Sequence, residues 1–424
     1  MTQQPQEGQR KLRVGIAGLG LGGAMALGGI DRLGLFEVVA AADLREQALE
    51  AFRSRYGGRT YSSVEALCDD PAVEAVWIST PTTLHCEHVR IAAERGKHMV
   101  VEKPMAVRVD EALAMVEVAE RYGVKLMCGN SASLLPGFRA MRQVVASGSI
   151  GEIQAINVWA YGDWMFRPRR PEELPTEAGG GVPYVMAPHQ IDVVRLLAGG
   201  MARSVRSMTG NWMSFRPGVG YYSAFIDFES GAAATLVYNG YGYFNTLELA
   251  PWAGEPKGWA QTAALRRALR SGQPVDDVAE KVATRFGERK ELQYHGAGEG
   301  GAPRTGAPKG YQPDCGMVIA SCDAGDIRQA PDGALWVYDE AGVSTVQVTS
   351  TLDQREAEAY GIYEAVVHNR EPVHSGRWGL ATIEVTAALL QSSATRRDVE
   401  LKHQCPSWQE SSTMYAGYPT VSAS

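Results

Sequence analysis

Near its beginning the chain runs from a short apolar segment directly into three glycines. Residues 12–17 read Leu-Arg-Val-Gly-Ile-Ala, and Gly18, Gly20 and Gly23 follow with the spacing Gly-x-Gly-x-x-Gly. The first glycine permits a tight turn, the second lets the backbone approach a pyrophosphate, and the third lets the next helix pack closely on the strand. The start of that helix offers free N–H groups to phosphate. The pattern therefore predicts a dinucleotide-binding unit.

An acidic residue follows the third glycine by twenty positions, at the end of a second apolar run. The run covers residues 37–42, and Asp43 comes next. A carboxylate at this place accepts a hydrogen bond from a ribose 2′-OH, which favours NAD as the cofactor. Arg45 leaves NADP open as the alternative, since an arginine can bind a 2′-phosphate. Because Asp43 is present, we interpret Arg45 as a surface residue of the next helix.

Apolar runs alternate with helical patterns from residue 11 to about residue 132. Such alternation is typical of βαβ units, and continuous apolar runs are typical of parallel strands covered by helices on both faces. We therefore predict an α/β fold that begins with a Rossmann dinucleotide-binding domain over residues 11–132. The expected strands are 12–17, 36–42, 74–79, 97–101 and 124–128, and the expected helices are 22–33, 44–55, 63–68, 84–95 and 109–122.

The expected strands of this domain end in residues that suit a cofactor site. Ligands of open α/β sheets lie outside the carboxyl ends of the strands, and here those ends carry Ser79-Thr80-Pro81 and Glu102-Lys103-Pro104. The residues expected to bind the cofactor are Gly18, Gly20, Leu21, Gly23, Asp43, Ser79, Thr80, Pro81, His85, Glu102 and Lys103.

The sequence pattern changes after about residue 133. Polar and apolar residues alternate in several later segments, which predicts an α+β domain with a mixed or antiparallel sheet that is open on one face. We assign residues 133–402 to this second domain, with an insertion at 253–312, and residues 403–424 to a mobile polar tail. The expected strands include 153–159, 205–212, 224–228, 232–238 and 317–322, and the expected helices are 137–147, 183–197, 356–368 and 380–395.

Length and composition limit the classes of protein to which the chain can belong. A chain of 424 residues is long enough for two domains, and a formal net charge of −7 argues against nucleic acid or an anionic membrane as the main partner. No apolar stretch approaches the roughly 20 residues that span a bilayer. Six cysteines without framework spacing and a polar N-terminus suggest a cytoplasmic protein. His85, Cys86 and His88 lack a second ligand cluster, so we expect no metal.

Four motifs together resemble the Gfo/Idh/MocA family of oxidoreductases, over about residues 11–252 and 316–402 of this chain. The resemblance implies an open-faced mixed sheet, homodimers or homotetramers formed through that sheet, and a cis peptide bond before Pro104. It also implies NAD(P)-linked oxidation of a secondary alcohol. The motifs are the glycine fingerprint, Ser79-Thr80-Pro81-x-x-x-His85, Glu102-Lys103-Pro104, and Gly179-Gly180-Gly181 followed by His189-x-x-Asp192.

The resemblance also implies which residues carry out catalysis. Oxidation of an alcohol needs a base for the hydroxyl proton, and Lys103 is the implied base. Because an unperturbed lysine has a pKa of about 10.4, burial and a positive nicotinamide are needed to lower it. His189 can share the proton, and Asp192, three residues further along a helix, can orient the imidazole. The alternatives are a structural lysine paired with Glu102 and a satisfied core histidine.

One departure from the family pattern bears on the substrate. Family members usually carry Asp four residues before the catalytic histidine, and this chain has Val185 there. A standard polyol is therefore a less natural substrate. Residues 163–174, 187–197 and 376–382 instead resemble phthalate cis-dihydrodiol dehydrogenases, which implies that a carboxylated cis-dihydrodiol is oxidised to a catechol.

An arginine-rich segment is the candidate substrate contact. Its arginines are Arg167, Arg169 and Arg170, interleaved with Trp164 and Phe166. They would bind a planar dicarboxylate, since guanidinium groups pair bidentately with carboxylates and an aromatic ring can cover the substrate. The alternative is a solvated loop whose arginines pair with Glu172 and Glu173.

Two other functions remain open from the sequence. One is a dehydrogenase for a sugar, polyol or glycoside. The other is a cofactor-sensing regulator that has this fold without turnover, and the presence of Lys103 and His189 argues against it.

Overall fold

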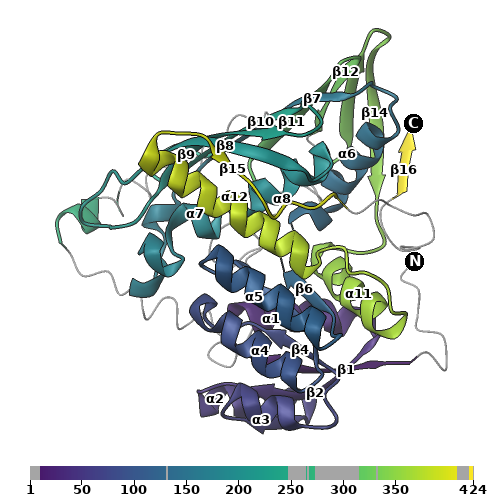
Figure 1. Ribbon diagram of the computed structural model, residues 1–424, viewed down its shortest axis with the longest axis vertical. Helices are drawn as coiled ribbons and strands as arrows, with labels where there is room; N and C mark the ends of the chain where they lie inside the picture. The colour runs from purple at the N-terminus through teal and green to yellow at the C-terminus, as the bar shows by residue number, and fades with distance from the viewer. Residues whose placement is uncertain are drawn as a thin grey trace. The chain divides into compact units, whose positions relative to one another are not determined.

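The chain forms two compact units in the computed structural model (Figure 1). Among the described residues, 10–129 and 352–383 belong to the first unit, and the remainder belong to the second. The insertion expected at 253–312 lies almost entirely outside the described part of the chain. The residues that the structure describes are 10–129, 132–246, 264, 267–272, 315–330, 333–407 and 420–423.

Six parallel strands form the sheet of the first unit in its described part. Their order is β3-β2-β1-β4-β5-β6, so β1 lies between β2 and β4. Ala17 at the end of β1 is in register with Ala42 of β2 and Ile78 of β4, so the three strands end at the same level. This is the predicted Rossmann sheet, although the sequence pattern did not predict the short β3. The strands are β1 (Leu12–Ala17), β2 (Phe36–Ala42), β3 (Arg59–Tyr61), β4 (Ala75–Ile78), β5 (His98–Glu102) and β6 (Leu126–Gly129).

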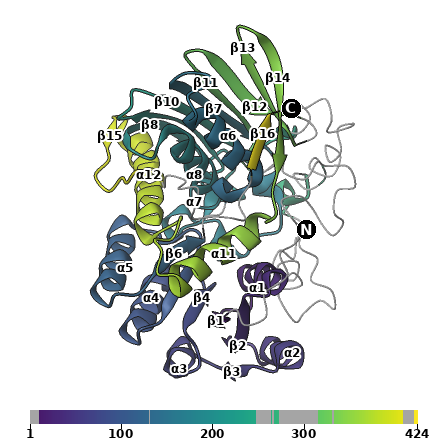
Figure 2. The same ribbon diagram turned by 90° about the vertical axis from the view of Figure 1, so that its right-hand side faces the viewer.

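Helices cover both faces of this sheet (Figure 2). Val76 and Ile78 of β4 pack with one helical layer, and Ala75 and Trp77 pack with the other. Because both faces of each strand are buried, the strands read as continuous apolar runs. One layer consists of α3 (Val64–Asp69), α4 (His85–Glu94) and α5 (Val109–Arg121), and the other consists of α1 (Leu21–Leu33), α2 (Glu46–Tyr56) and α11 (Gln354–Val367).

Helix α11 belongs to the first unit, although its place in the sequence suggested the second. It begins with a capping box, in which the Asp353 carboxylate accepts hydrogen bonds of 2.8 Å from the N–H groups of Arg355 and Glu356. Its apolar face, including the buried Ile362, packs in the core beneath β1. Gly29 of α1 allows the close contact, because a Cβ there would lie 2.7 Å from the Arg355 carbonyl oxygen. Because this apolar face is buried against the first sheet, α11 belongs to the first unit, although residues 133–402 were all assigned to the second domain.

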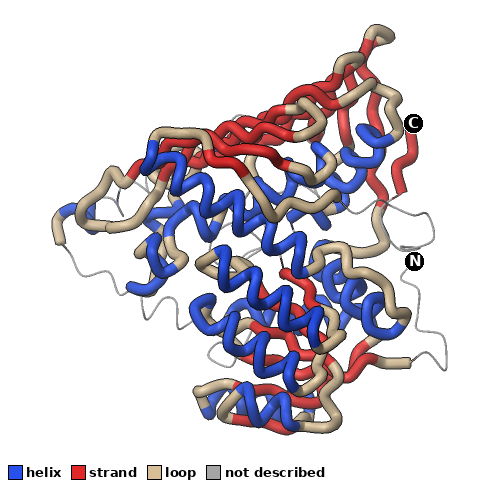
Figure 3. Tube along the Cα trace, viewed as in Figure 1, coloured by secondary structure: helices blue, strands red, loops and turns tan. Residues whose placement is uncertain are grey.

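A mixed sheet forms the second unit, with helices on one of its faces (Figure 3). Its order in the described part of the chain is β15-β8-β9-β10-β7-β11-β12-β13-β14-β16, and among these pairs only β7 and β10 are parallel. Along β7, Val158 and Ala160 are buried in the core, whereas Trp159 is 39% exposed on the open face. The α/β fold class is thus confirmed.

The elements of the second unit have the following bounds. The helices are α6 (Pro136–Ala146), α7 (Gly181–Val185), α8 (Ala187–Ala198) and α12 (Gly376–Thr395), whose first residues belong to the first unit. The strands are β7 (Ile153–Tyr161), β8 (Ala202–Gly210), β9 (Tyr221–Phe228), β10 (Ala233–Asn239), β11 (Met317–Cys322), β12 (Gly325–Gln329), β13 (Leu335–Asp339), β14 (Gly342–Thr349), β15 (Val399–Glu400) and β16 (Thr420–Ala423).

The end of the chain differs from the expected mobile tail. Strand β16 pairs antiparallel with residues Val346 to Thr349 of β14. The Glu384 carboxylate accepts hydrogen bonds from the N–H groups of Lys402 and His403, at 2.6 and 2.8 Å. Strand pairing and hydrogen bonds to backbone N–H groups therefore order parts of the chain near its end, where the polar composition of residues 403–424 suggested mobility.

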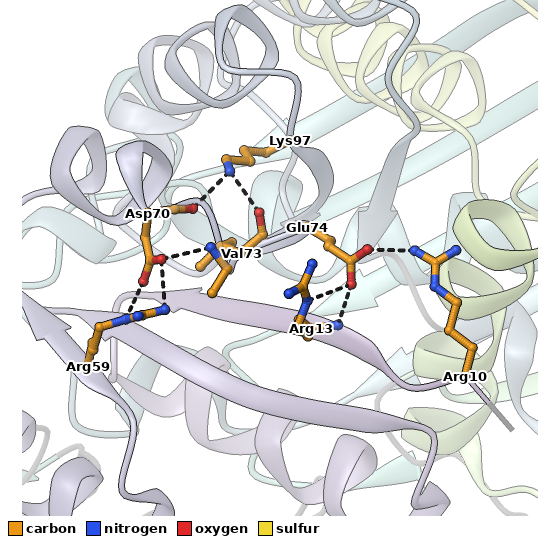
Figure 4. Close-up of polar contacts among 8 residues, drawn as sticks. Arg10, Arg13, Arg59, Asp70, Val73, Glu74 and Lys97 are labelled. Carbon is orange, nitrogen blue, oxygen red and sulfur yellow. Dashed lines mark hydrogen bonds and ion pairs between the residues drawn. The ribbon is translucent and has the colours of Figure 1, made fainter. Parts of the chain in front are cut away.

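Ion pairs and hydrogen bonds hold the loops before β4 and β5 in place at the amino-terminal ends of the strands (Figure 4). The Asp70 side chain is 1% exposed and pairs with Arg59 at 2.7 Å. It also accepts hydrogen bonds from the Ala72 N–H at 2.9 Å and the Tyr61 hydroxyl at 3.0 Å. Lys97 Nζ donates to the Asp70 carbonyl at 2.9 Å. Figure 4 also shows the ion pairs of Glu74 with Arg10 and Arg13.

We expect Asp70→Asn to destabilise the protein at neutral pH. We also expect the free energy of unfolding of the variant to fall less than that of the wild type as the pH is lowered. Burial by itself raises the pKa of Asp70, but hydrogen bonds from Ala72, Tyr61 and Arg59 outweigh burial, and the pKa lies below its usual value. The charged carboxylate therefore stabilises the fold above the unfolded-state pKa of about 3.9, and the contribution is lost as pH falls through the lower folded-state pKa. Urea denaturation at neutral pH should show a loss of about 2 kcal/mol.

Asp69→Asn is the matched control, because the Asp69 side chain is 63% exposed in its pair with Arg95. Exposed pairs contribute about 0–1 kcal/mol, so this variant should resemble the wild type. Equal destabilisation in the two variants would contradict a special role for the buried carboxylate.

Candidate active site

The glycine loop has the geometry that a dinucleotide phosphate requires. Gly18 lies at φ +91°, in the left-handed region, and a Cβ there would lie 2.7 Å from the Ser79 carbonyl oxygen. A Cβ on Gly23 would lie 2.2 Å from the Gly18 carbonyl oxygen, so glycine allows α1 to start close to β1. Beyond its chain neighbours, no atom lies within 4 Å of a Cβ built on Gly20. That open space lies at the N-terminus of α1, which begins at Leu21.

The residues after β4 lie beside this loop. The Ser79 hydroxyl is buried and has no hydrogen-bond partner among the described residues. Such a group is costly unless a ligand or water completes it, so its presence fits a bound dinucleotide. The Thr80 hydroxyl lies 2.8 Å from His88 Nδ1, and Pro81 begins the 3₁₀ turn that leads into α4. The glycine loop, the start of α1 and Ser79 are therefore the groups that would hold the phosphates.

Asp43 follows β2 and faces the glycine loop. Its side chain is 9% exposed, and its carboxylate accepts a hydrogen bond of 2.8 Å from the Leu19 N–H. Arg45 donates to the same carboxylate from Nε at 3.1 Å and from Nη2 at 3.2 Å. The sequence placed Arg45 on the surface of the next helix, and the structure places it at the N-cap of α2, where its side chain is 24% exposed and its guanidinium lies against the Asp43 carboxylate.

His85 lies behind the loops that a cofactor would contact. The residue is 1% exposed, with Nε2 lying 2.8 Å from the Thr80 carbonyl oxygen and Nδ1 lying 3.2 and 3.1 Å from those of Pro104 and Met105. Burial lowers the pKa of His85, and the surrounding carbonyls oppose this effect. The peptide bond between Lys103 and Pro104 is cis, as the family resemblance implied. The ring ties the end of β4 to the turn after β5, which makes His85 a positioning residue.

Lys103 follows Glu102, the last residue of β5. Glu102 is 8% exposed, and its carboxylate accepts a hydrogen bond from Trp77 Nε1 at 3.3 Å. Arg355 of α11 pairs with Glu102 at 3.4 Å and with Glu358 at 2.7 Å. The sequence suggested an ion pair between Glu102 and Lys103 as an alternative, and it did not predict the pair with Arg355. Arg355 comes 253 residues after Glu102 and reaches it only because α11 packs on this sheet.

His189 and Asp192 lie on α8 in the second unit, whereas Lys103 lies in the first. Every residue of α8 is buried. Asp192 accepts a hydrogen bond of 2.8 Å from the Ser133 N–H and thereby fixes the turn before α6. Gln190 anchors the helix to the sheet, since its side chain donates to the Val237 carbonyl of β10 at 3.2 Å. That the Asp192 carboxylate also orients the His189 imidazole stays a prediction.

The three arginines between Trp164 and Arg170 have different surroundings. Arg167 Nε pairs with Asp163 at 2.9 Å, and Arg170 pairs with Glu173. The Arg169 guanidinium instead stacks on the buried Trp164 ring, 4.0 Å from its centroid, and donates a long hydrogen bond of 3.5 Å to the Trp164 carbonyl.

Arg169 is thus the cation of this segment without a carboxylate partner among the described residues. Its Nε is buried and has no hydrogen-bond partner in the described part of the chain. Burial lowers the pKa of Arg169 to about 10, against the favourable effect of Glu173 nearby. A guanidinium in these surroundings is prepared to bind an anion.

Arg216 holds this segment in place, and the sequence did not single it out. It is 4% exposed, and it donates from Nε to the Met165 carbonyl at 2.8 Å and from Nη2 to the Arg167 carbonyl at 2.6 Å. No local pattern marks such a residue, because its partners are backbone carbonyls about 50 positions earlier. Arg216 could therefore be recognised only from its burial in the structure.

The described residues include no helix that is long and apolar enough to cross a membrane. In the same residues, no group of three or more His, Cys, Asp or Glu side chains could hold a metal ion.

Comparison with known proteins places these features in a family. Residues 12–130 match the model of an oxidoreductase family with an NAD-binding Rossmann fold, and residues 138–249 match the GFO/IDH/MocA C-terminal domain. A 1-carboxy-3-chloro-3,4-dihydroxycyclohexa-1,5-diene dehydrogenase of Comamonas testosteroni is 32% identical over 382 residues, which cover 90% of this chain and 94% of that protein.

Solved structures agree with this assignment. A structure from Bordetella bronchiseptica RB50 is 34% identical with a TM-score of 0.79, and the match covers 92% of this chain and 100% of that one. The WlbA dehydrogenase of Bordetella pertussis, solved with NADH and UDP-GlcNAcA, has the same fold at 19% identity, with a TM-score of 0.65 over 93% of this chain and 99% of that one. The chain therefore belongs to the Gfo/Idh/MocA family and is an NAD-dependent dehydrogenase that acts on a CH–OH group.

Proposed function

We propose that this dehydrogenase oxidises a carboxylated cis-dihydrodiol of cyclohexadiene to a catechol. The observation that carries the proposal is Arg169, whose guanidinium stacks on Trp164 and has no carboxylate partner among the described residues. The Comamonas testosteroni relative supports the same substrate class, since its name specifies a carboxylated dihydroxycyclohexadiene.

A substrate carboxylate would supply what Arg169 lacks. A partly buried cation that is not paired directly with a carboxylate is costly, and a pKa of about 10 leaves the group protonated at neutral pH. A planar carboxylate matches the fork of guanidinium donors and would give Nε an acceptor. Val185 fits the same reading, because an aspartate at that position would repel an anionic substrate and suit a hydroxyl-rich sugar.

We assign proton transfer to Lys103 and His189. NAD supplies the two-electron acceptor when it is bound. Lys103 would accept the proton of the reacting hydroxyl, and His189 would share it, with Asp192 orienting the imidazole. The ketone that forms then loses the C–H proton of the neighbouring carbinol carbon and gains an O–H, which makes the ring an aromatic catechol. Aromatisation would draw the oxidation forward.

Arg169→Ala should raise KM for a carboxylated dihydrodiol by about 10- to 150-fold, because a lost charge-assisted hydrogen bond costs roughly 1.5–3 kcal/mol. Arg167→Ala is the matched control and should have a smaller effect, since Arg167 already pairs with Asp163. The measurement is steady-state kinetics with the phthalate cis-dihydrodiol, followed at the nicotinamide absorbance band.

The rival substrate class is tested in the same assay. Inositol, glucose and glycosides should be poor substrates, because they would leave the Arg169 guanidinium without an acceptor. Efficient turnover of a neutral polyol that is insensitive to Arg169→Ala would discard the dihydrodiol and leave a sugar, polyol or glycoside dehydrogenase.

Lys103→Met should lower kcat by about 10²- to 10⁴-fold, the usual contribution of a positioned acid–base group, while NAD binding stays nearly unchanged. His189→Ala should have a similar but weaker effect. Lys97→Met serves as the control. Lys97 lies at the amino-terminal end of β5, opposite to Lys103, and donates to the carbonyls of Asp70 and Val73. Near-normal turnover by Lys103→Met would refute its role as the base.

We also propose that the open face of the second sheet joins copies of the chain into a homodimer or homotetramer. Met208, Phe225 and Trp159 on this face are 48%, 46% and 39% exposed. Phe225 is in register with Thr235 of β10, and Trp159 with Val237 two residues further along the same strand. Large apolar side chains gathered on one exposed face support an interface.

Phe225→Arg and Trp159→Arg should each shift the mass measured by light scattering toward the 45.8 kDa monomer. The reason is that an arginine at the centre of an interface is desolvated without a partner. Tyr122→Arg, at a site that is 47% exposed in the first unit, should keep the wild-type mass. A wild type that is monomeric at micromolar concentration would overturn the proposal.

The cysteines support a cytoplasmic location. None of the six forms a disulfide in the structure, and Cys68, Cys128 and Cys315 are buried.

A further inference from the structure

We propose that Gln190 is a positioning residue, which holds His189 in the place that proton transfer requires. The two residues are neighbours in the first turn of α8, and the Gln190 side chain is fully buried. Its amide connects this turn to β9, to β10 and to the residue that precedes β11 by two positions, all within the second unit. The inference rests on the proposed role of His189 and adds a residue that acts through it.

The Gln190 amide uses both of its N–H groups and its oxygen in hydrogen bonds. Nε2 donates to the Val237 carbonyl at 3.2 Å and to the Cys315 carbonyl at 3.0 Å, and Oε1 accepts from the Tyr222 hydroxyl at 2.8 Å. Because both carbonyls need a donor, the amide has one orientation. Burial raises the pKa of Tyr222 well above its usual value, so the hydroxyl keeps the proton that it donates. The end of the side chain is therefore fixed through both of its polar atoms.

Further contacts tie the His189 backbone to the same surroundings. The Cys315 thiol lies 3.7 Å from the His189 carbonyl oxygen and donates to it, while the Cys315 carbonyl accepts from Gln190. The His189 N–H donates to the Met186 carbonyl at 3.1 Å, at the start of the helix. Cys315 is fully buried, and water does not compete for these contacts. Two neighbouring residues of α8 are thus held against one buried segment.

Rotation of α8 about its axis is the motion that these hydrogen bonds oppose. Successive residues of an α-helix point about 100° apart, so fixing the Gln190 side chain also fixes the direction of the His189 side chain. A helix with its side chains has a radius of about 5–6 Å, and a rotation of about 10° therefore moves the tip of a side chain by about 1 Å. A misplacement of that size can lower a rate about 100-fold. Loss of the Gln190 contacts should therefore affect the rate of the reaction.

The far end of α8 has an anchor of its own, which supplies a matched control. Arg195 donates from Nε to Gln404 Oε1 at 3.1 Å, and Gln404 Nε2 donates to the Glu384 carboxylate at 2.8 Å. Arg195 lies almost two helical turns after His189. Gln404→Met therefore removes a glutamine amide from contact with the same helix and leaves the first turn untouched.

The test is steady-state kinetics of the full chain with NAD and phthalate cis-dihydrodiol, or with inositol if the wild type prefers a polyol. Gln190→Met keeps the length of the side chain and removes its hydrogen bonds. It should lower kcat by about 10- to 100-fold, because the imidazole is displaced. KM and the Kd of NAD, measured by calorimetric titration, should stay near wild-type values. Gln404→Met should keep the wild-type kcat, although it lowers the urea midpoint of unfolding.

Tyr222→Phe is a milder variant that decides the question if Gln190→Met fails to fold. It removes one hydroxyl and keeps the ring, which stacks on Tyr238. Because the amide then loses one of its hydrogen bonds, kcat should fall by about 2- to 10-fold. A wild-type kcat in either variant, or an equal loss of kcat in Gln404→Met, would overturn the inference.

A double-mutant cycle separates positioning from a general loss of structure. If Gln190 acts through His189, adding Gln190→Met to His189→Ala should leave kcat within about 2-fold of that of His189→Ala alone. A further fall as large as that of Gln190→Met in the wild-type background would overturn the inference and leave the role of His189 intact. A wild-type kcat in His189→Ala would instead refute the proposed role of His189, and the inference about Gln190 would fall with it.

Discussion

The buried carboxylate of Glu102 needs a cation, and Arg355 provides it. One guanidinium serves both Glu102 and the fully buried Glu358, at 3.4 and 2.7 Å. Removing a carboxylate from water costs several kcal/mol unless it is paired and hydrogen-bonded, so the strand that ends next to Lys103 is stable only with α11 in place. The turn that carries Lys103 therefore depends on a helix from a distant part of the chain.

Polar side chains around the cofactor site act mainly by holding backbone. His85 contacts the carbonyls of Thr80, Pro104 and Met105, and Asp43 accepts the N–H of Leu19. Both residues thus connect a loop to its neighbour instead of leaving each loop to its own local contacts. A site built in this way keeps its shape before the cofactor binds, which lowers the entropy lost on binding.

Three arginines in one short segment differ in function because their neighbours differ. Arg167 and Arg170 have acidic partners close by in sequence, whereas the Arg169 guanidinium stacks on Trp164 and its Nε is buried. Arg216 keeps the backbone of this segment in place through two carbonyls. The composition of the segment suggests anion binding, and the positions of Asp163 and Glu173 decide which of its cations are already paired.

The sequence by itself determined the Rossmann unit, the glycine loop with Asp43, and the family. These features depend on spacing and periodicity over short stretches, which is why the ranges 12–17 and 36–42 agree with β1 and β2. Only the tertiary structure decided which unit receives α11, which cation pairs with Glu102, and where Arg45 and Arg169 point. Such choices depend on which groups are removed from water together, and residues far apart in the chain carry no local pattern of that burial.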